Sequence, residues 1–144
     1  MSGDPSPGKL LLHVDGASRG NPGEAGFGVY VSTPDGESIA ELFGYLGRAT
    51  NNVAEYQGLL HALRYAHERG ARSVQVYSDS ELVVRQIEGR YRVKHPALQP
   101  LFREAQSLLG RFETARVSHV RREHNRDADR LANRAVDEKA SQLA

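Results

Sequence analysis

The chain has 144 residues and contains no cysteine. It can therefore form neither disulfide bonds nor thiolate metal sites. No hydrophobic run is long enough for a signal peptide or a bilayer span. These absences fit a reducing compartment, so we expect a cytoplasmic protein with no membrane partner. The opening MSGDPSPGK predicts a short disordered tail over residues 1–8.

A large excess of charge of one sign is also missing, since the formal net charge is +1 at pH 7. However, acidic side chains outnumber basic ones in residues 1–80, and basic ones outnumber acidic ones in residues 81–134. Any single arginine is most simply a solvated residue, but for the whole set a phosphate-facing surface is at least as good an explanation. The set comprises Arg85, Arg90, Arg92, Lys94, Arg121, Arg122, Arg126, Arg130 and Arg134.

The hydrophobic pattern divides the chain into strands and helices. Alternating or continuous apolar residues predict strands over 9–15, 25–32, 38–47, 73–78 and 113–120. Apolar residues on one helical face predict helices over 51–69 and 126–139. A short helix is expected over 80–88, and a longer one over 97–110, just after Pro96. Hairpin strands followed by alternating strands and helices imply an α/β fold with one mixed sheet flanked by helices. We place this single domain over residues 9–140.

Local signals set the expected element ends. Asp15-Gly16 is expected to open a loop, SRGNPG, because its residues favour turns. Asn51 or Asn52 is expected to cap the first helix, and Gly70 to end it.

Four acidic residues occupy positions that structure alone would not favour. Asp15 and Asp79 each end a predicted strand, and sites in open α/β sheets form beyond such ends. Glu55 shares the apolar face of its helix with Leu59 and Leu63, where a carboxylate needs a partner or a cation. Asp129 flanks the apolar stripe of the last helix.

Each acid also has a purely structural explanation. Asp15 could belong to a turn, and Asp79 could cap the helix that starts near Ser80. Glu55 and Asp129 could be first-turn acids favoured by the helix dipole. If these explanations held, the placement of all four acids would be coincidental, so a shared functional role is favoured. An oxygen-only cluster suits a hard cation such as Mg²⁺ or Mn²⁺, and two such ions can promote phosphodiester hydrolysis.

Four stretches resemble, in order, the signature blocks of type 1 ribonuclease H. They are DGASRGNPG (15–23), RATNNVAEYQGLLHAL (48–63), YSDSELVV (77–84) and REHNRDADRLAN (122–133). The resemblance covers about residues 9–138. It implies a five-stranded mixed sheet with helices on both faces and a metal-dependent endonuclease that cuts the RNA strand of RNA–DNA hybrids. The family's metal-binding carboxylates fall on Asp15, Glu55, Asp79 and Asp129.

The resemblance also implies positions that contact the hybrid. They fall on Ser18, Asn21, Asn51 and Asn52, with Arg48 and Thr50 in a pocket for a DNA-strand phosphate. Asparagine amides can bond a shallow minor groove that displays 2′-hydroxyls, and an arginine fork suits a phosphate. Glu81 follows Asp-Ser where the family often has glutamine, which puts a base contact there in doubt.

Two further departures concern loops. The basic helix and loop of many members is replaced by GRYRVKHP, so we expect weaker hybrid binding. The histidine that many members carry ten residues before the last aspartate would be His119, which lies in a predicted strand. The short loop carries His124 instead, and we regard His124 as an auxiliary candidate for proton transfer, with Arg122 or Glu123 able to share the role.

The sequence thus predicts a monomeric ribonuclease H that uses two Mg²⁺ or Mn²⁺ ions and leaves 5′-phosphate and 3′-hydroxyl ends. A non-catalytic hybrid-binding module is the first alternative, and the intact set of four acids argues against it. Another nuclease or strand-transfer enzyme of the same fold is the second, and the GNPG and TNN blocks favour hybrid recognition instead.

Overall fold

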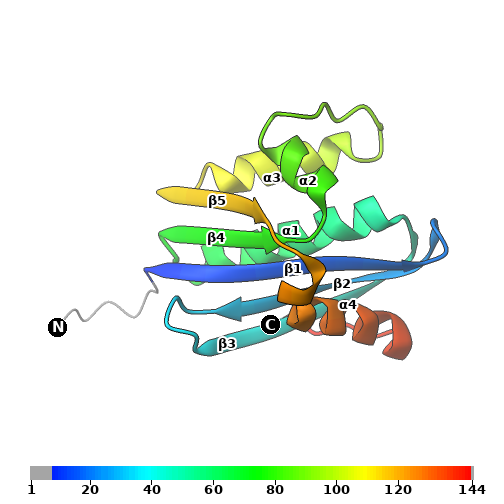
Figure 1. The fold of residues 1–144 in the computed structure, drawn as a ribbon, viewed down its shortest axis with the longest axis horizontal. Coiled ribbons are helices and arrows are strands. Elements are labelled where there is room, and N and C mark those ends of the chain that lie inside the picture. The colour runs from blue at the N-terminus through cyan, green and yellow to red at the C-terminus, as the bar shows by residue number, and fades with distance from the viewer. Residues whose placement is uncertain (1–7, 144) are drawn as a thin grey trace.

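A computed structural model describes residues 8–143 and contains a single five-stranded sheet in the order β3-β2-β1-β4-β5 (Figure 1). The strands are β1 (Lys9–Arg19), β2 (Gly23–Ser32), β3 (Ser38–Ala49), β4 (Ser73–Ser78) and β5 (Thr114–His119). Strands β1, β2 and β3 pair antiparallel, whereas β4 pairs parallel with both β1 and β5. The predicted mixed sheet is confirmed, and β1 at its centre joins the two halves.

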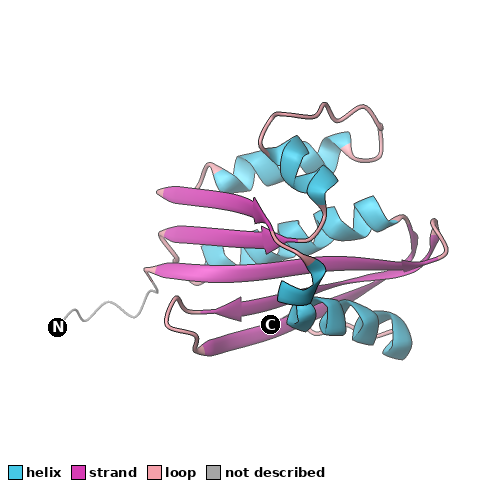
Figure 2. Cartoon of the chain, viewed as in Figure 1, coloured by secondary structure: helices cyan, strands magenta, loops and turns pink. Residues whose placement is uncertain are grey.

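Helices cover both faces of the sheet, as expected (Figure 2). They are α1 (Asn51–Glu68), α2 (Glu81–Ile87), α3 (Gln99–Leu109) and α4 (Arg126–Glu138), with a short 3₁₀ turn at Arg122–His124. Helix α4 lies alone on one face, against β2 and β1, and the other helices lie on the opposite face. The element order is the predicted one with the 3₁₀ turn added.

The main core lies between α1 and the sheet. Tyr56, Leu59 and Leu63 of α1 are at most 1% exposed, as are Leu10 and Leu12 of β1. Each such side chain contributes about 1.5–3 kcal/mol relative to an exposed one. This packing fixes the start of α1 over the end of β1, which is where the acidic residues lie.

On the other face, α4 approaches the sheet through small residues. A Cβ on Gly28 of β2 would lie 2.3 Å from the Ala128 carbonyl oxygen and 2.5 Å from the Ala132 nitrogen. Both alanines are fully buried. Glycine at this position therefore sets how closely α4, and with it Asp129, approaches the sheet.

The expected loop after Asp15 was wrong. Strand β1 continues to Arg19, because Gly16 to Arg19 pair with Phe27 to Glu24 of β2 across a hairpin. Turn-forming residues thus serve here as strand residues, since the neighbouring strand supplies the partners that a local pattern does not reveal.

The expected N-cap of α1 was wrong, whereas Gly70 ends this helix as predicted, with a positive φ of 77° directly after the Arg69 C-cap. Thr50, rather than Asn51 or Asn52, caps α1: its hydroxyl accepts a hydrogen bond from the Val53 nitrogen at 3.2 Å. Ser80, rather than Asp79, caps α2 through the Val83 nitrogen. The carboxylate of Asp79 is therefore not used as the helix cap and is available to the site described below.

The expected N-terminal tail falls, except for Gly8, outside the described residues. Within residues 8–143, no helix combines the length and the apolar character that crossing a bilayer requires.

The close approach of α4 gives a first prediction. Gly28→Ala should lower the free energy of unfolding by about 1–3 kcal/mol, because the new methyl group overlaps the backbone of α4. Chemical denaturation followed by circular dichroism measures this. Gly110→Ala is the matched control, since its Cβ would lie 3.6 Å from the nearest atoms, and its stability should stay equal or rise slightly. Equal stabilities of the two variants would contradict the packing described.

Candidate active site

Two carboxylates lie where the parallel pairing of β1 with β4 ends. The register of β1 with β4 places Val14 beside Ser78, so Asp15 and Asp79 each stand one residue further along. Asp15 is buried, and the Asp79 side chain is 12% exposed. The structure thus brings these two acids within reach of each other on neighbouring strands.

Glu55 joins them from the first turns of α1. A Cβ on Gly16 would lie 2.5 Å from the Glu55 nitrogen, so only glycine allows the helix this close to β1. The Gly16 N–H lies 2.8 Å from Glu55 Oε1 and donates to it, and the Ser78 hydroxyl donates to Oε2 at 3.3 Å. The buried carboxylate is thus held by groups from both central strands.

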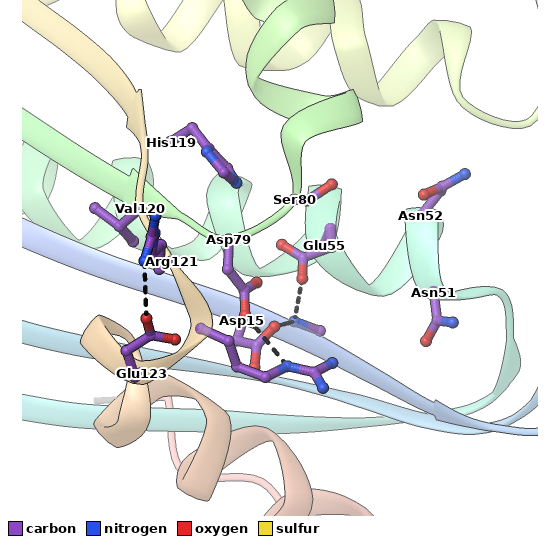
Figure 3. Close-up of a pocket in the computed structure, with 12 residues that line it drawn as sticks. Asp15, Asn51, Asn52, Glu55, Asp79, Ser80, His119, Val120, Arg121 and Glu123 are labelled. Atoms are coloured by element: carbon purple, nitrogen blue, oxygen red, sulfur yellow. Dashed lines mark hydrogen bonds and ion pairs between the residues drawn. The ribbon is translucent and has the colours of Figure 1, made fainter.

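The three acids form one cluster, and in Figure 3 their carboxylates point toward one another. Each offers an oxygen within 4.8 Å of the others. Burial, followed by the facing Glu55 and Asp79 carboxylates, raises the pKa of Asp15, and burial raises the pKa of Glu55. A hard divalent cation would offset this crowding of negative charge, and the all-oxygen donor set fits one. These residues therefore suit a Mg²⁺ or Mn²⁺ site.

Asp129 is not part of this triad. It is half-exposed on α4 and lies in a cleft on the other side of Asp15. Its carboxyl adds a smaller contribution to the raised pKa of Asp15, after burial and the other acids. The structure thus brings three predicted acids together and leaves the fourth beside them.

Two clefts meet at Asp15. One, of about 550 Å³, is lined by the triad with Asn51, Asn52 and His119, and the asparagines and the histidine border it on opposite sides in Figure 3. The other, of about 370 Å³, is lined by Ser18, Arg19, Asp129 and Asn133 among others. Asp15, Gly16, Asn51 and Arg122 line both. An extended ligand can therefore cross the acids from one cleft to the other.

Several predicted binding residues serve the loop itself. The Ser18 Oγ lies 2.8 Å from the carbonyl oxygens of both Gly20 and Ala49, which share its single proton. Asn21 Oδ1 accepts the Asn51 N–H at 3.0 Å. These contacts, with the Thr50 cap, hold the hairpin loop against the start of α1.

Two other predicted residues lie away from the acids. Arg48 is exposed on β3 and lines neither cleft. Glu81 is exposed and pairs with Arg85 of the same helix at 2.8 Å. This pairing agrees with the doubt about a base contact there.

The end of β5 and the loop before α4 supply two further residues of the site, His119 and Arg122, which the sequence offered only as secondary candidates. Arg122 Nε lies 3.9 Å from Asp79 Oδ2, although the side chain is 86% exposed, and His119 lines the larger cleft. His124, the predicted auxiliary residue, is exposed and lines neither cleft. His119 stood at the family's spacing from Asp129 but was set aside because its strand pattern suggested no site role.

The basic set does not form one surface. Arg85 and Arg90 belong to α2 and the loop after it, on the face opposite α4, which carries Arg130 and Arg134. Many members pair with acids. The pairs are Arg85–Glu81, Arg90–Glu88, Arg121–Glu123, Arg130–Glu41 and Arg134–Glu138. The phosphate-facing interpretation therefore does not hold for the set as a whole.

Known proteins are similar to this chain over nearly its whole length. A family model described as "Reverse transcriptase-like" matches residues 13–135. "Bifunctional protein Rv2228c" of Mycobacterium tuberculosis is 47% identical over 137 residues, covering 94% of this chain but 38% of that protein. "Ribonuclease HI" of Halobacterium salinarum is 40% identical over 131 residues, covering 91% of this chain and 66% of that protein. The chain thus spans well under half the length of the mycobacterial relative.

Solved structures agree closely. The N-terminal RNase H domain of the M. tuberculosis protein matches this chain with a TM-score of 0.87 at 48% identity. The match covers 90% of this chain and 94% of that structure's chain. LC11-RNase H1, solved in complex with an RNA/DNA hybrid, has a TM-score of 0.86 at 38% identity and covers 90% of this chain and 98% of its own.

The crowded acids give a second prediction. In chelator, the melting temperature should fall as the pH rises from about 5 to about 8. The reason is that carboxyls with a raised pKa keep their protons to a higher pH in the folded state than in the unfolded state. Asp15→Asn should melt higher than the natural protein and depend less on pH. Mg²⁺ should raise the melting temperature of the natural protein and leave that of the variant nearly unchanged.

Asp127→Asn is the control for this experiment. Asp127 is an exposed acid of α4 that pairs with Arg130, so the variant should respond to pH and Mg²⁺ as the natural protein does. Identical melting curves for Asp15→Asn and the natural protein in chelator would show that the cluster carries no electrostatic penalty.

Proposed function

Because the chain belongs to the type 1 ribonuclease H family, we propose that it is an endonuclease that hydrolyses the RNA strand of RNA–DNA hybrids. The observation that carries the proposal is the buried triad of Asp15, Glu55 and Asp79 where two clefts meet. The hybrid complex of LC11-RNase H1, a structural relative over most of this chain, supports the same substrate here.

The proposed cofactor is a pair of Mg²⁺ or Mn²⁺ ions held by Asp15, Glu55, Asp79 and Asp129. The triad alone suits one ion, and Asp129 on the far side of Asp15 extends the oxygen set beyond it. When bound, such ions acidify water and offset charge on the phosphate and the leaving oxygen. Asp15, which lines both clefts, is the residue that both ions would share.

The protein's own groups hold the substrate and these acids in place. Gly16 N–H and the Ser78 hydroxyl fix the orientation of Glu55, so the triad is formed before substrate arrives. Asn51 and Asn52 line the larger cleft, where their amides can bond the sugar edge and the 2′-hydroxyls of the RNA strand. When water attacks the phosphorus, the P–O3′ bond breaks and the leaving O3′ takes up a proton, so the products carry a 5′-phosphate and a 3′-hydroxyl.

The remaining contacts are proposed for the edges of the substrate. Ser18 and Asn21 shape the loop beside the smaller cleft, and Thr50 fixes the start of α1. Exposed Arg48, two residues before Thr50, can reach a DNA-strand phosphate. Glu81, paired with Arg85, is the weakest member of the predicted contact set.

Among the loop residues, Arg122 is better placed than His124 to act on the scissile phosphate. Arg122 lines both clefts beside Asp79, whereas His124 faces neither. An arginine there can stabilise charge on the phosphate without transferring a proton.

The domain extent, the oligomeric state and the cellular location are also proposals. Residues 9–140 are proposed to fold as one catalytic domain, because β1 lies between strands from both halves of the chain. A monomeric state and a cytoplasmic location stay predictions. A non-catalytic binding module would have no need of three buried acids, whose crowding costs stability.

The function is tested by cleavage of a labelled RNA–DNA hybrid in Mg²⁺, compared with duplex DNA, duplex RNA and single strands. We expect cleavage of the hybrid's RNA strand, with 5′-phosphate ends. Asp79→Asn should lower turnover at least about a thousandfold, or ~4 kcal/mol in the barrier, because a charged ligand is lost. Asp127→Asn is again the matched control. Near-normal turnover by Asp79→Asn would remove the catalytic assignment, and equal cleavage of duplex DNA would favour another nuclease of this fold.

The loop gives a separate prediction. Arg122→Ala should lower turnover about tenfold or more at saturating hybrid, and Arg122→Lys should recover part of the loss. His124→Ala should lose about tenfold or less, a barrier change of ~1.4 kcal/mol. Arg111→Ala, an exposed arginine in neither cleft, controls for the loss of charge. A loss of several hundredfold for His124→Ala, with hybrid binding intact, would reverse this assignment.

A further inference from the structure

Asp129 has a defined neighbour one helical turn along α4. Asn133 Nδ2 donates to the Asp129 carbonyl oxygen at 2.9 Å and lies 3.3 Å from its carboxylate Oδ1. Asn133 is half-buried and lines the smaller cleft together with Asp129. The carboxylate of Asp129 is therefore tethered through a neutral amide.

The amide is in turn oriented by the central strand. Arg19 Nη2, at the end of β1, donates to Asn133 Oδ1 at 3.0 Å, and its Nη1 lies 2.9 Å from Asp137 Oδ1. A guanidinium can only donate and a carboxylate can only accept. Asn133 satisfies both only with its oxygen toward Arg19 and its NH₂ toward Asp129. A flipped amide would place its NH₂ against the Arg19 donor and its oxygen against the Asp129 oxygens.

We propose that Arg19 and Asn133 are positioning residues that aim the carboxylate of Asp129 at the cation site beside Asp15. The proposal rests on the proposed function, because it takes Asp129 as a cation ligand. The other three acids are held by adjoining strands and by Gly16 and Ser78. Asp129 stands on a separate helix, and its carboxylate is linked to β1 through the side chains of Asn133 and Arg19.

Arg19 lies on the same strand as Asp15, four residues further along. The chain of contacts from Arg19 through Asn133 to Asp129 therefore links the fourth acid to the strand that carries the first. It sets where α4 presents its carboxylate relative to β1. The register of β1 beyond Asp15, where a loop was expected, is what brings Arg19 to this position.

Asn133 also keeps Arg19 from pairing directly with Asp129. A direct guanidinium–carboxylate pair would offset the charge that a cation needs and would compete with it. An amide between the two transmits orientation without adding positive charge. The contact of Arg19 with Asp137 holds the guanidinium on the outer side of Asn133.

A purely stabilising role is the alternative. The Arg19 and Asp137 side chains are 47% and 62% exposed, and exposed ion pairs of this kind contribute little to stability. Removing Arg19 should therefore leave the protein folded, so its effect on cation binding can be measured separately.

The test is Mn²⁺ titration of the full chain by calorimetry without substrate, together with the Mg²⁺ dependence of hybrid cleavage. Loss of one such hydrogen bond should weaken cation binding about fivefold in Asn133→Ala. Arg19→Met should show a smaller loss in the same direction, and Arg19→Lys, which keeps a donor, should bind nearly as the natural protein does. Turnover at saturating Mg²⁺ should change less than the Mg²⁺ requirement.

The decisive arm is a double-mutant cycle with Asp129→Asn. If Asn133 acts through Asp129, then Asn133→Ala should weaken cation binding no further in the Asp129→Asn background. Glu138→Gln, which breaks the exposed Arg134–Glu138 pair on the same helix, is the matched control. Unchanged cation binding by both Asn133→Ala and Arg19→Met would overturn the proposal, as would a loss that persists in full without Asp129. Failure of the natural protein to cut hybrids would overturn the proposed function instead, since the calorimetric arm does not depend on cleavage.

Discussion

The structure depends on holding three carboxylates close together in a buried space. Asp15, Glu55 and Asp79 present oxygens within 4.8 Å of one another, and burial raises the pKa of both Asp15 and Glu55. Such a cluster opposes folding unless a cation is bound. The parallel pairing of β1 with β4, the bare backbone of Gly16 and the hydroxyl of Ser78 all keep the acids in place. The site is thus assembled by the fold and does not wait for its ligand.

The apolar packing around this site supplies the stability that the acids oppose. Tyr56, Leu59 and Leu63 anchor α1 over the central strand, and this packing keeps Glu55 buried at the wall of the larger cleft. On the opposite face, Gly28 lets α4 pack closely enough to present Asp129 beside Asp15. Helices on both faces therefore place acids around Asp15, where the pairing of β1 with β4 ends and where two clefts meet.

Much of this was predictable from local patterns. Apolar patterns and turn residues predicted the existence of every helix and strand. The helical period also placed Glu55 on a buried face, because burial of an α1 residue follows from its spacing relative to Leu59 and Leu63. What failed depends on partners distant in sequence. Residues 16–19 favour turns by composition, yet they pair with β2. The basic residues cluster in sequence but divide between opposite faces of the sheet. The sequence named His124 ahead of Arg122 in the same loop, and the folded loop instead places Arg122 beside Asp79.

The most direct test of the central claim is a crystal structure of the protein grown with Mn²⁺, with anomalous scattering recorded for manganese. We predict an anomalous peak about 2.0–2.3 Å from carboxylate oxygens of Asp15, Glu55 and Asp79, with the triad little changed from its arrangement without metal. A peak at other residues, or none at this cluster in saturating Mn²⁺, would contradict the claim that the fold holds these acids together for a cation.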